Sequence, residues 1–161
     1  MYKILSAIFL ATALWGCNPT QMAHDKAQYK SAAVEQAVDN RHYTISVRTM
    51  IPSRGPSREL SSGYFIKVKG DTLVSYLPYF GRAYSLPYGG GNGLNFTAYT
   101  STYSMIKTKR GAHRVVIEAK SDDDTYRYVI DIFDNGSSSL RITAQQREAI
   151  SYNGELDVKQ Q

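Results

Sequence analysis

The feature that most constrains the fold is a change of hydrophobic period after Asn40, where apolar residues begin to recur at every second position. Alternation of this kind is typical of strands with one buried face. Eight such runs follow in about 120 residues, a spacing typical of a barrel or a sandwich. The runs cover residues 43–51, 60–68, 73–80, 94–109, 113–117, 126–132, 140–144 and 150–156.

The segments between the runs are short and rich in turn-forming residues. Asn135-Gly136 is the strongest example, because this pair suits the turn that matches the twist of a hairpin. None of these segments is long enough for a crossover helix, which favours an antiparallel meander. Closing a meander removes its exposed edges. We therefore expect an all-β domain with one N-terminal helix, whose strands, about eight, form a curled sheet or a small lipocalin-like barrel. The alternative is a two-sheet β-sandwich.

One helix is predicted before the strands. Residues 23–40 contain good helix formers and no glycine or proline, with small apolar residues three and four positions apart. The stripe is thin, so we expect this helix to pack over one mouth or edge of the domain without forming its core. With 161 residues the chain has room for one domain. We place it at residues 23–158, with a tail at 159–161.

The first residues of the chain are typical of an export signal. Lys3 is followed by an apolar run, Ile4 to Trp15, that is too short to span a bilayer. Leu14-Trp15-Gly16-Cys17 then resembles the lipobox of bacterial lipoproteins, although Trp15 is bulkier than usual at its position. We expect residues 1–16 to be a lipoprotein signal peptide, Cys17 to carry the lipid, and residues 17–22 to form the tether.

The expected location follows from this anchor. Several acyl chains on one residue give stable attachment, since each buried methylene contributes about 0.8 kcal/mol. The membrane is therefore one expected partner. Asn18 follows the cysteine, where enteric bacteria use aspartate as a signal for inner-membrane retention. This favours the outer membrane within a bacterial cell envelope.

Several classes of function lack their sequence signals. Cys17 is the single cysteine, so no disulfide is expected, and no histidine pair or HExxH motif indicates a metal. No Gly-x-Ser-x-Gly elbow is present, the glycines at 89–93 lack the context of a phosphate loop, and Asp122 to Asp124 are expected to form a solvated turn. The net charge of +5 is spread along the chain, unlike that of a nucleic-acid binder. We expect no enzyme, no cofactor and no metal.

The most distinctive local sequence runs from Ser75 to Tyr84, SYLPYFGRAY. It could form an aromatic rim around a ligand mouth, with an arginine that pairs with an anionic group. It could also be a core strand that ends in a bulge, with Pro78 at an edge and Gly81 at a bend. The residues that would form a ligand or partner surface are Tyr76, Tyr79, Phe80, Arg82 and Tyr84.

This stretch, together with Asp134-Asn135-Gly136 and Ile150-Ser151-Tyr152-Asn153-Gly154, resembles the domain-of-unknown-function 4251 family of Bacteroidetes-type lipoproteins. The resemblance covers residues 25 to 156. It implies a cell-envelope protein with a β-rich fold, and it implies no catalytic or binding residue.

Two hypotheses for the function remain open. The first is a ligand-binding module, in which the interior or mouth of the sheet holds a small apolar or amphipathic molecule. The second is an interaction or scaffold lipoprotein that presents an exposed aromatic surface to an envelope protein. A cavity would favour the first hypothesis, and a contiguous exposed patch would favour the second.

Overall fold

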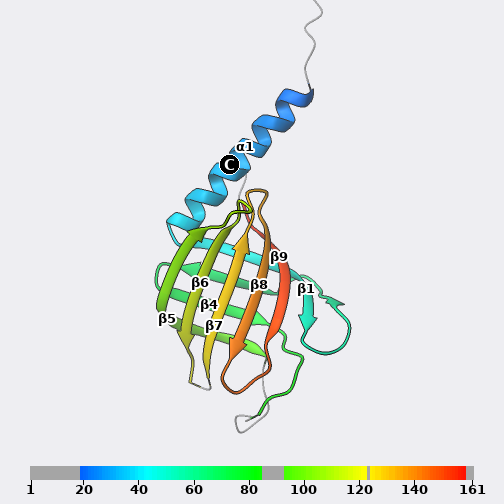
Figure 1. Ribbon diagram of the computed structural model, residues 1–161, viewed down its shortest axis with the longest axis vertical. Helices are drawn as coiled ribbons and strands as arrows, with labels where there is room; N and C mark the ends of the chain where they lie inside the picture. The colour runs from blue at the N-terminus through cyan, green and yellow to red at the C-terminus, as the bar shows by residue number, and fades with distance from the viewer. Residues whose placement is uncertain (1–18, 85–92, 123, 159–161) are drawn as a thin grey trace, which may run out of the picture.

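Figure 1 shows the computed structural model, which describes residues 19–84, 93–122 and 124–158. Helix α1 spans Pro19–Asp39 and precedes the strands of the described chain. The strands are β1 (His42–Pro52), β2 (Arg58–Glu59), β3 (Phe65–Lys69), β4 (Thr72–Leu77), β5 (Leu94–Lys107), β6 (His113–Lys120), β7 (Thr125–Ile132), β8 (Ser137–Ala144) and β9 (Ile150–Leu156). The prediction of an all-β domain with one N-terminal helix is confirmed.

The strands form a closed barrel. Strands β3 to β9 follow one another as an antiparallel meander, and β1 pairs with both β3 and β9. This last pairing closes a ring of eight strands, and the short β2 is added along β1 outside the ring. The predicted small barrel is therefore correct, and the sandwich is not formed.

Two long strands turn the corners of the barrel. The first part of β5 pairs with β4 and its second part pairs with β6, with an irregularity between Thr100 and Thr102. In β1 the equivalent irregularity lies between Val47 and Thr49, within its pairing with β9 and just beyond Ser46, the last residue in register with β3. An extra residue bends a strand and increases its twist. Strands β1, β3 and β4 accordingly run across behind β6 to β9 (Figure 1).

The interior of the barrel is filled with side chains. Tyr126, Tyr128 and Tyr152 are fully buried among isoleucines, leucines and valines. Phe96 stacks on Tyr126 with 4.6 Å between ring centroids. The Tyr152 hydroxyl donates to the carbonyl oxygen of Pro78 at 2.6 Å, which satisfies its polar group inside the core.

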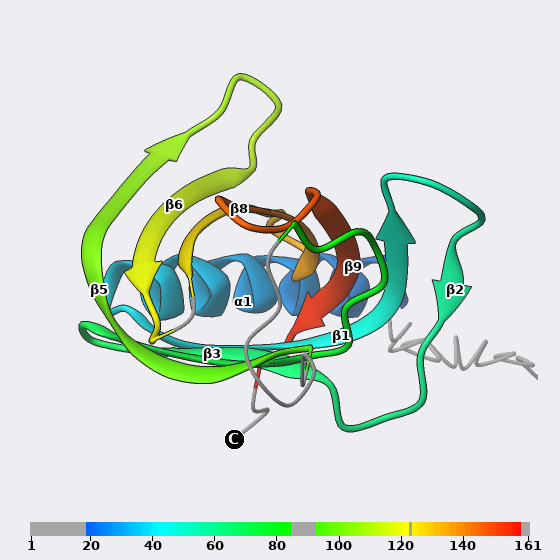
Figure 2. The ribbon, with the colours of Figure 1, turned by 90° about the horizontal axis from the view of Figure 1, so that it is seen from below.

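Helix α1 covers one end of the barrel, which we call the helix end. Val34 and Val38 are fully buried in the same core cluster as the barrel interior. The Tyr103 hydroxyl donates to the carbonyl oxygen of Val38 at 3.2 Å. The helix thus closes one mouth, as expected, and it also contributes to the core. Seen from the other end, α1 lies across the far side of the strands (Figure 2).

The first half of α1 extends past the barrel. All side chains from His24 to Tyr29 are exposed, and the ribbon of this part stands clear of the strands (Figure 1). The helix begins at Pro19, so residues 19–22, which we assigned to the tether, are helical. The expected signal peptide at 1–16, Cys17 and the expected tail at 159–161 lie outside the described residues. Among the described residues no helix is both long and apolar enough to cross a membrane.

Candidate functional site

The connections after β1, β4, β6 and β8 meet at the end of the barrel opposite α1, which we call the loop end. A meander places alternate connections at the same end, so segments far apart in the sequence become neighbours here. Four of the five residues singled out from the sequence lie in one of these connections, in residues 79–84. The loop end is therefore the candidate site for binding a ligand or partner.

The segment 78–84 leaves β4 at Leu77 and folds into a tight loop. The Tyr79 hydroxyl lies 2.9 Å from the carbonyl oxygen of Arg82 and 3.1 Å from that of Glu148. Burial and the nearby Glu148 charge raise the pKa of Tyr79, so its hydroxyl stays protonated as a donor. The expected run 73–80 thus ends three residues early as a strand, because Pro78 has no N–H for a ladder.

Backbone hydrogen bonds fasten the same loop to the β8–β9 connection. The Glu148 N–H donates to the carbonyl oxygen of Arg82, and the Tyr84 N–H donates to that of Gln146. Ala83 forms an isolated bridge with Arg147. Gly81 allows the fold, since a Cβ at this position would lie 2.7 Å from the Tyr79 hydroxyl oxygen. The loop is therefore a fixed element of the barrel end.

The fixed loop leaves three large side chains exposed. Phe80 is 46% exposed, Tyr84 is 70% exposed, and Arg82 is also exposed. Phe80 and Arg82 line a hollow of about 360 Å³, together with Arg54, Tyr79, Gly81 and Glu148. The structure thus brings Tyr79, Phe80 and Arg82 together, with Tyr84 beside them.

Two arginines from the β1–β3 connection complete the surface. The Arg58 guanidinium lies 4.0 Å from the centroid of the Phe80 ring, a cation–π distance. Arg54 lies 3.4 Å from the Glu148 carboxylate, whose side chain is only 12% exposed. We call this set the loop-end surface: Arg54, Arg58, Tyr79, Phe80, Arg82 and Tyr84. No local sequence pattern marks Arg54, Arg58 or Glu148 as part of a site.

Buried polar residues support the loop-end surface from below. The guanidinium of Arg147, which is 6% exposed, donates to the carbonyl oxygen of Gly93 at 2.8 Å and lies 5.5 Å from the Tyr79 ring centroid. Asp124 is 8% exposed and accepts the backbone N–H groups of Thr125, Gln145 and Gln146. The prediction of a solvated turn is therefore wrong for Asp124, whose carboxylate joins two connections of the loop end.

Tyr76 lies apart from the other predicted residues. It is on the outer face of β4, 46% exposed, and stacks on Tyr64 with 5.7 Å between ring centroids. Phe65 of the neighbouring strand lies 5.9 Å from the same ring. These three rings form an aromatic cluster on the wall of the barrel.

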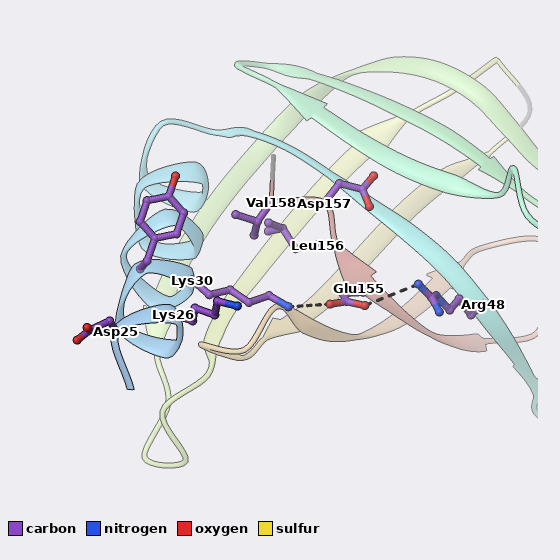
Figure 3. Close-up of a pocket in the computed structure, with 9 residues that line it drawn as sticks. Asp25, Lys26, Lys30, Arg48, Glu155, Leu156, Asp157 and Val158 are labelled. Atoms are coloured by element: carbon purple, nitrogen blue, oxygen red, sulfur yellow. Dashed lines mark hydrogen bonds and ion pairs between the residues drawn. The ribbon is translucent and has the colours of Figure 1, made fainter. Parts of the chain in front are cut away.

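A second hollow lies at the helix end, between α1 and the end of β9 (Figure 3). This groove of about 730 Å³ has both charged and apolar walls, and Tyr29, Leu156 and Val158 supply the apolar part. Across it, the Lys30 ammonium contacts the Glu155 carboxylate at 2.7 Å, and Arg48 reaches the same carboxylate at 3.8 Å. The hydrogen bond from Lys30 lowers the pKa of Glu155.

Within the described residues, no group of three histidine, cysteine, aspartate or glutamate residues is placed to hold a metal ion. His113 is the first residue of β6, where it is 3% exposed.

The fold and its surface define a class of protein, a small antiparallel barrel with a packed interior. The side chains that a ligand or partner could contact lie on its outer wall and at its two ends. The chain belongs to the family described as "Domain of unknown function (DUF4251)", whose model matches residues 25–156. The family resemblance seen in the sequence is thereby confirmed.

A solved structure shares this fold. The crystal structure of a DUF4251 family protein from Bacteroides eggerthii DSM 20697, at 1.95 Å resolution, superposes with a TM-score of 0.60 and 13% sequence identity. The match covers 80% of this chain and 87% of the other. No curated protein matches the chain.

Proposed function

We propose that the protein is a non-enzymatic lipoprotein of the bacterial cell envelope that binds an envelope protein through its loop-end surface. The observation that carries the proposal is the fixed loop 79–84, which holds Phe80, Arg82 and Tyr84 outward. Aromatic residues and arginine are the residue types most enriched at binding hot spots. Side chains held in place before binding lose less entropy when a partner arrives.

The position of the surface relative to the expected anchor supports this proposal. Cys17 precedes Pro19, the first residue of α1, by two positions. Helix α1 covers one end of the barrel, and the loop-end surface lies at the other end (Figure 1). A lipid on Cys17, in the outer membrane as Asn18 favours, would therefore leave this surface directed away from the bilayer.

The packing of the barrel favours this proposal over an enclosed ligand. The interior positions of the strands carry buried side chains, including three tyrosines with no exposed area. A small apolar molecule would need space that these side chains fill. An aromatic surface needs no such space.

The proposal can be tested in cells by placing a photo-crosslinking amino acid at position 84. We expect irradiation to give one dominant adduct with an envelope protein, and we expect Arg82→Gln in the same chain to reduce its yield. Position 99 provides the matched control, because Tyr99 is 82% exposed on the outer face of β5. Equal adducts from positions 84 and 99, or no adduct at 84, would refute binding through this surface.

The lipoprotein part of the proposal has a separate test. Cys17→Ser should abolish labelling by radioactive palmitate and release the protein from the membrane fraction. Labelling that survives this substitution would contradict anchoring at Cys17. Fractionation of the labelled protein into inner and outer membranes then tests the expected outer-membrane location.

A second candidate function is supported by the groove beside α1. Its volume of about 730 Å³ falls within the range of small-molecule sites, and it combines the apolar Tyr29 and Val158 with the charged Lys26. An amphipathic molecule fits such walls. Native mass spectrometry of the purified protein would detect it, and Tyr29→Ala should then reduce its occupancy. Protein recovered without any bound molecule from its own cells would count against this candidate.

A further inference from the structure

The charges around the loop-end hollow indicate which charge its partner carries. Arg54, Arg58 and Arg82 stand around Phe80, and Glu148 is the carboxylate that lines the same hollow. Glu148 is already engaged by Arg54 at 3.4 Å. Among the described residues, the guanidinium of Arg82 has no hydrogen-bond or ion-pair partner and is exposed. The hollow is therefore positively charged, and the Arg82 guanidinium is free to bind a new anion.

We propose that the loop-end surface binds an acidic segment of its protein partner, in which a carboxylate side chain lies next to an apolar one. The inference rests on the proposed function, and it adds the chemistry of the partner. Arg82 would bind the carboxylate, because guanidinium groups pair with carboxylates through two parallel hydrogen bonds. Phe80 and Tyr84 would contact the apolar side chain.

The fixed geometry of the loop gives this pairing its selectivity. The Tyr79 hydroxyl donates to the Arg82 carbonyl oxygen at 2.9 Å, and the Glu148 N–H donates to the same oxygen at 3.0 Å. The arginine backbone therefore cannot move freely with respect to Phe80 two residues before it. A ligand must offer its anionic and apolar groups at a matching separation, which short peptide segments do readily.

The size and position of the hollow argue for a protein partner. A hollow of about 360 Å³ lies at the lower end of the range of small-molecule sites, so it has room for one or two side chains of a partner but not for a large cofactor. Anionic lipid is the other abundant source of negative charge near a membrane. The surface lies at the end of the barrel opposite α1, however, so the expected anchor would hold it away from the lipid headgroups.

The test uses the full lipidated protein in detergent and a fluorescein-labelled nonapeptide that alternates glutamate with phenylalanine. A second peptide carries glutamine in place of glutamate. By fluorescence anisotropy, we expect the glutamate peptide to bind about tenfold more tightly than the glutamine peptide, the effect of one charge-assisted pair. Raising the salt concentration should reduce this difference, because exposed charges are screened.

The variants assign this preference to the proposed residues. Arg82→Gln should remove most of the preference for glutamate, and Phe80→Ala should weaken both peptides. Arg141→Gln is the control, since Arg141 is an exposed arginine on β8, away from the loop end. Equal binding of the two peptides by the wild type, or an equal effect of Arg141→Gln and Arg82→Gln, would overturn the inference.

Two further outcomes separate this inference from the proposed function. If vesicles of anionic lipid bind in an Arg82-dependent manner and the peptides do not, the partner is a membrane and the inference is wrong. If the crosslinked adduct at position 84 forms equally with Arg82→Gln while both peptides bind alike, the surface still binds a protein but not through an acidic segment. Loss of the adduct itself would refute the proposed function.

Discussion

The hydroxyl of Tyr79 donates to the carbonyl oxygen of Arg82, three residues further along the chain, at 2.9 Å. This contact turns the chain back on itself directly after β4. It also places the side chains of Phe80 and Arg82 on the outside of the turn, where both are exposed. A half-buried tyrosine thereby controls the presentation of its neighbours.

The first prediction concerns this contact. Tyr79→Phe removes the hydroxyl and leaves the carbonyls of Arg82 and Glu148 without its hydrogen bond. We expect the free energy of unfolding to fall by about 1 kcal/mol. Hydrogen exchange at the Tyr84 and Glu148 amides should accelerate, because these amides fasten the same loop. Tyr99→Phe, on the exposed face of β5, is the control, and unchanged exchange in Tyr79→Phe would contradict this role.

The second prediction concerns the closure of the barrel at Gly154. This residue of β9 lies opposite Val47, next to the irregularity in β1, and a Cβ on it would overlap the carbonyl oxygen of Ser46. Gly154→Ala should therefore separate β1 from β9 and destabilise the domain by about 1–3 kcal/mol in urea unfolding. Asn153→Ala, at the exposed neighbouring position, should have a much smaller effect. Equal stability of the two variants would show that β1 tolerates a side chain here.

The third prediction concerns the ion pair that joins α1 to β9. Lys30 lowers the pKa of Glu155 below its usual 4.5, so the pair stabilises the fold above pH 4.5. This contribution disappears as the pH falls through the lowered pKa. Because both side chains are partly exposed, Glu155→Gln should cost only about 0.5 kcal/mol at neutral pH.

Urea unfolding at neutral and acidic pH checks this prediction. The difference in free energy of unfolding between wild type and Glu155→Gln should disappear in acid. Glu35→Gln, on the exposed side of α1, is the matched control and should change the free energy of unfolding little. A difference that persists in acid would mean that Glu155 stabilises the fold without its charge.

The fourth prediction concerns the buried tyrosines. Burial raises the pKa of Tyr128 and of Tyr152 above the ordinary 10.0. Their contribution to stability is fully present below pH 10 and is lost as the pH rises towards the raised values, since the unfolded chain ionises first. We expect a late group of tyrosines in an ultraviolet titration, which ionises only as the domain unfolds.

Tyr128→Phe tests the origin of that effect. The Tyr128 hydroxyl donates to the Ser75 hydroxyl at 3.0 Å inside the barrel, so its removal should cost about 1–3 kcal/mol at neutral pH. The decline of stability above pH 10 should become shallower at the same time. A decline as steep as in the wild type would place the late ionisation on other tyrosines.

Much of the barrel could be predicted because local pattern and topology agree. Alternation located β6 to β9, and the Asn135-Gly136 turn joined β7 to β8 as expected. The pattern was less informative where a strand bends. Strict alternation would place Ile51 on the same face as Val47, but the extra residue at the irregularity reverses the alternation, and Met50 is buried in its place.

The candidate site was predictable only in part. Local composition identified Phe80, Arg82 and Tyr84, but Arg54 and Arg58 carry no such signal in their own segment. The topology brings Arg54 and Arg58 to the loop end, because the chain of a meander returns to the same end of the barrel after every second strand. Asp124 was misread for a related reason: its three N–H donors include two from Gln145 and Gln146, which are distant in the sequence.

The pairing of β1 with β9 has a consequence for how the chain folds. Every other pairing in the ring joins strands close in the sequence, whereas this one joins the first strand to the last. Contacts between residues far apart in the sequence form late, because a large loop must close before these contacts contribute to stability. During synthesis, which proceeds from the amino end, one edge of β1 would therefore stay unpaired until β9 has been made. Deletion of β9 should consequently leave an open sheet prone to self-association rather than a slightly smaller barrel.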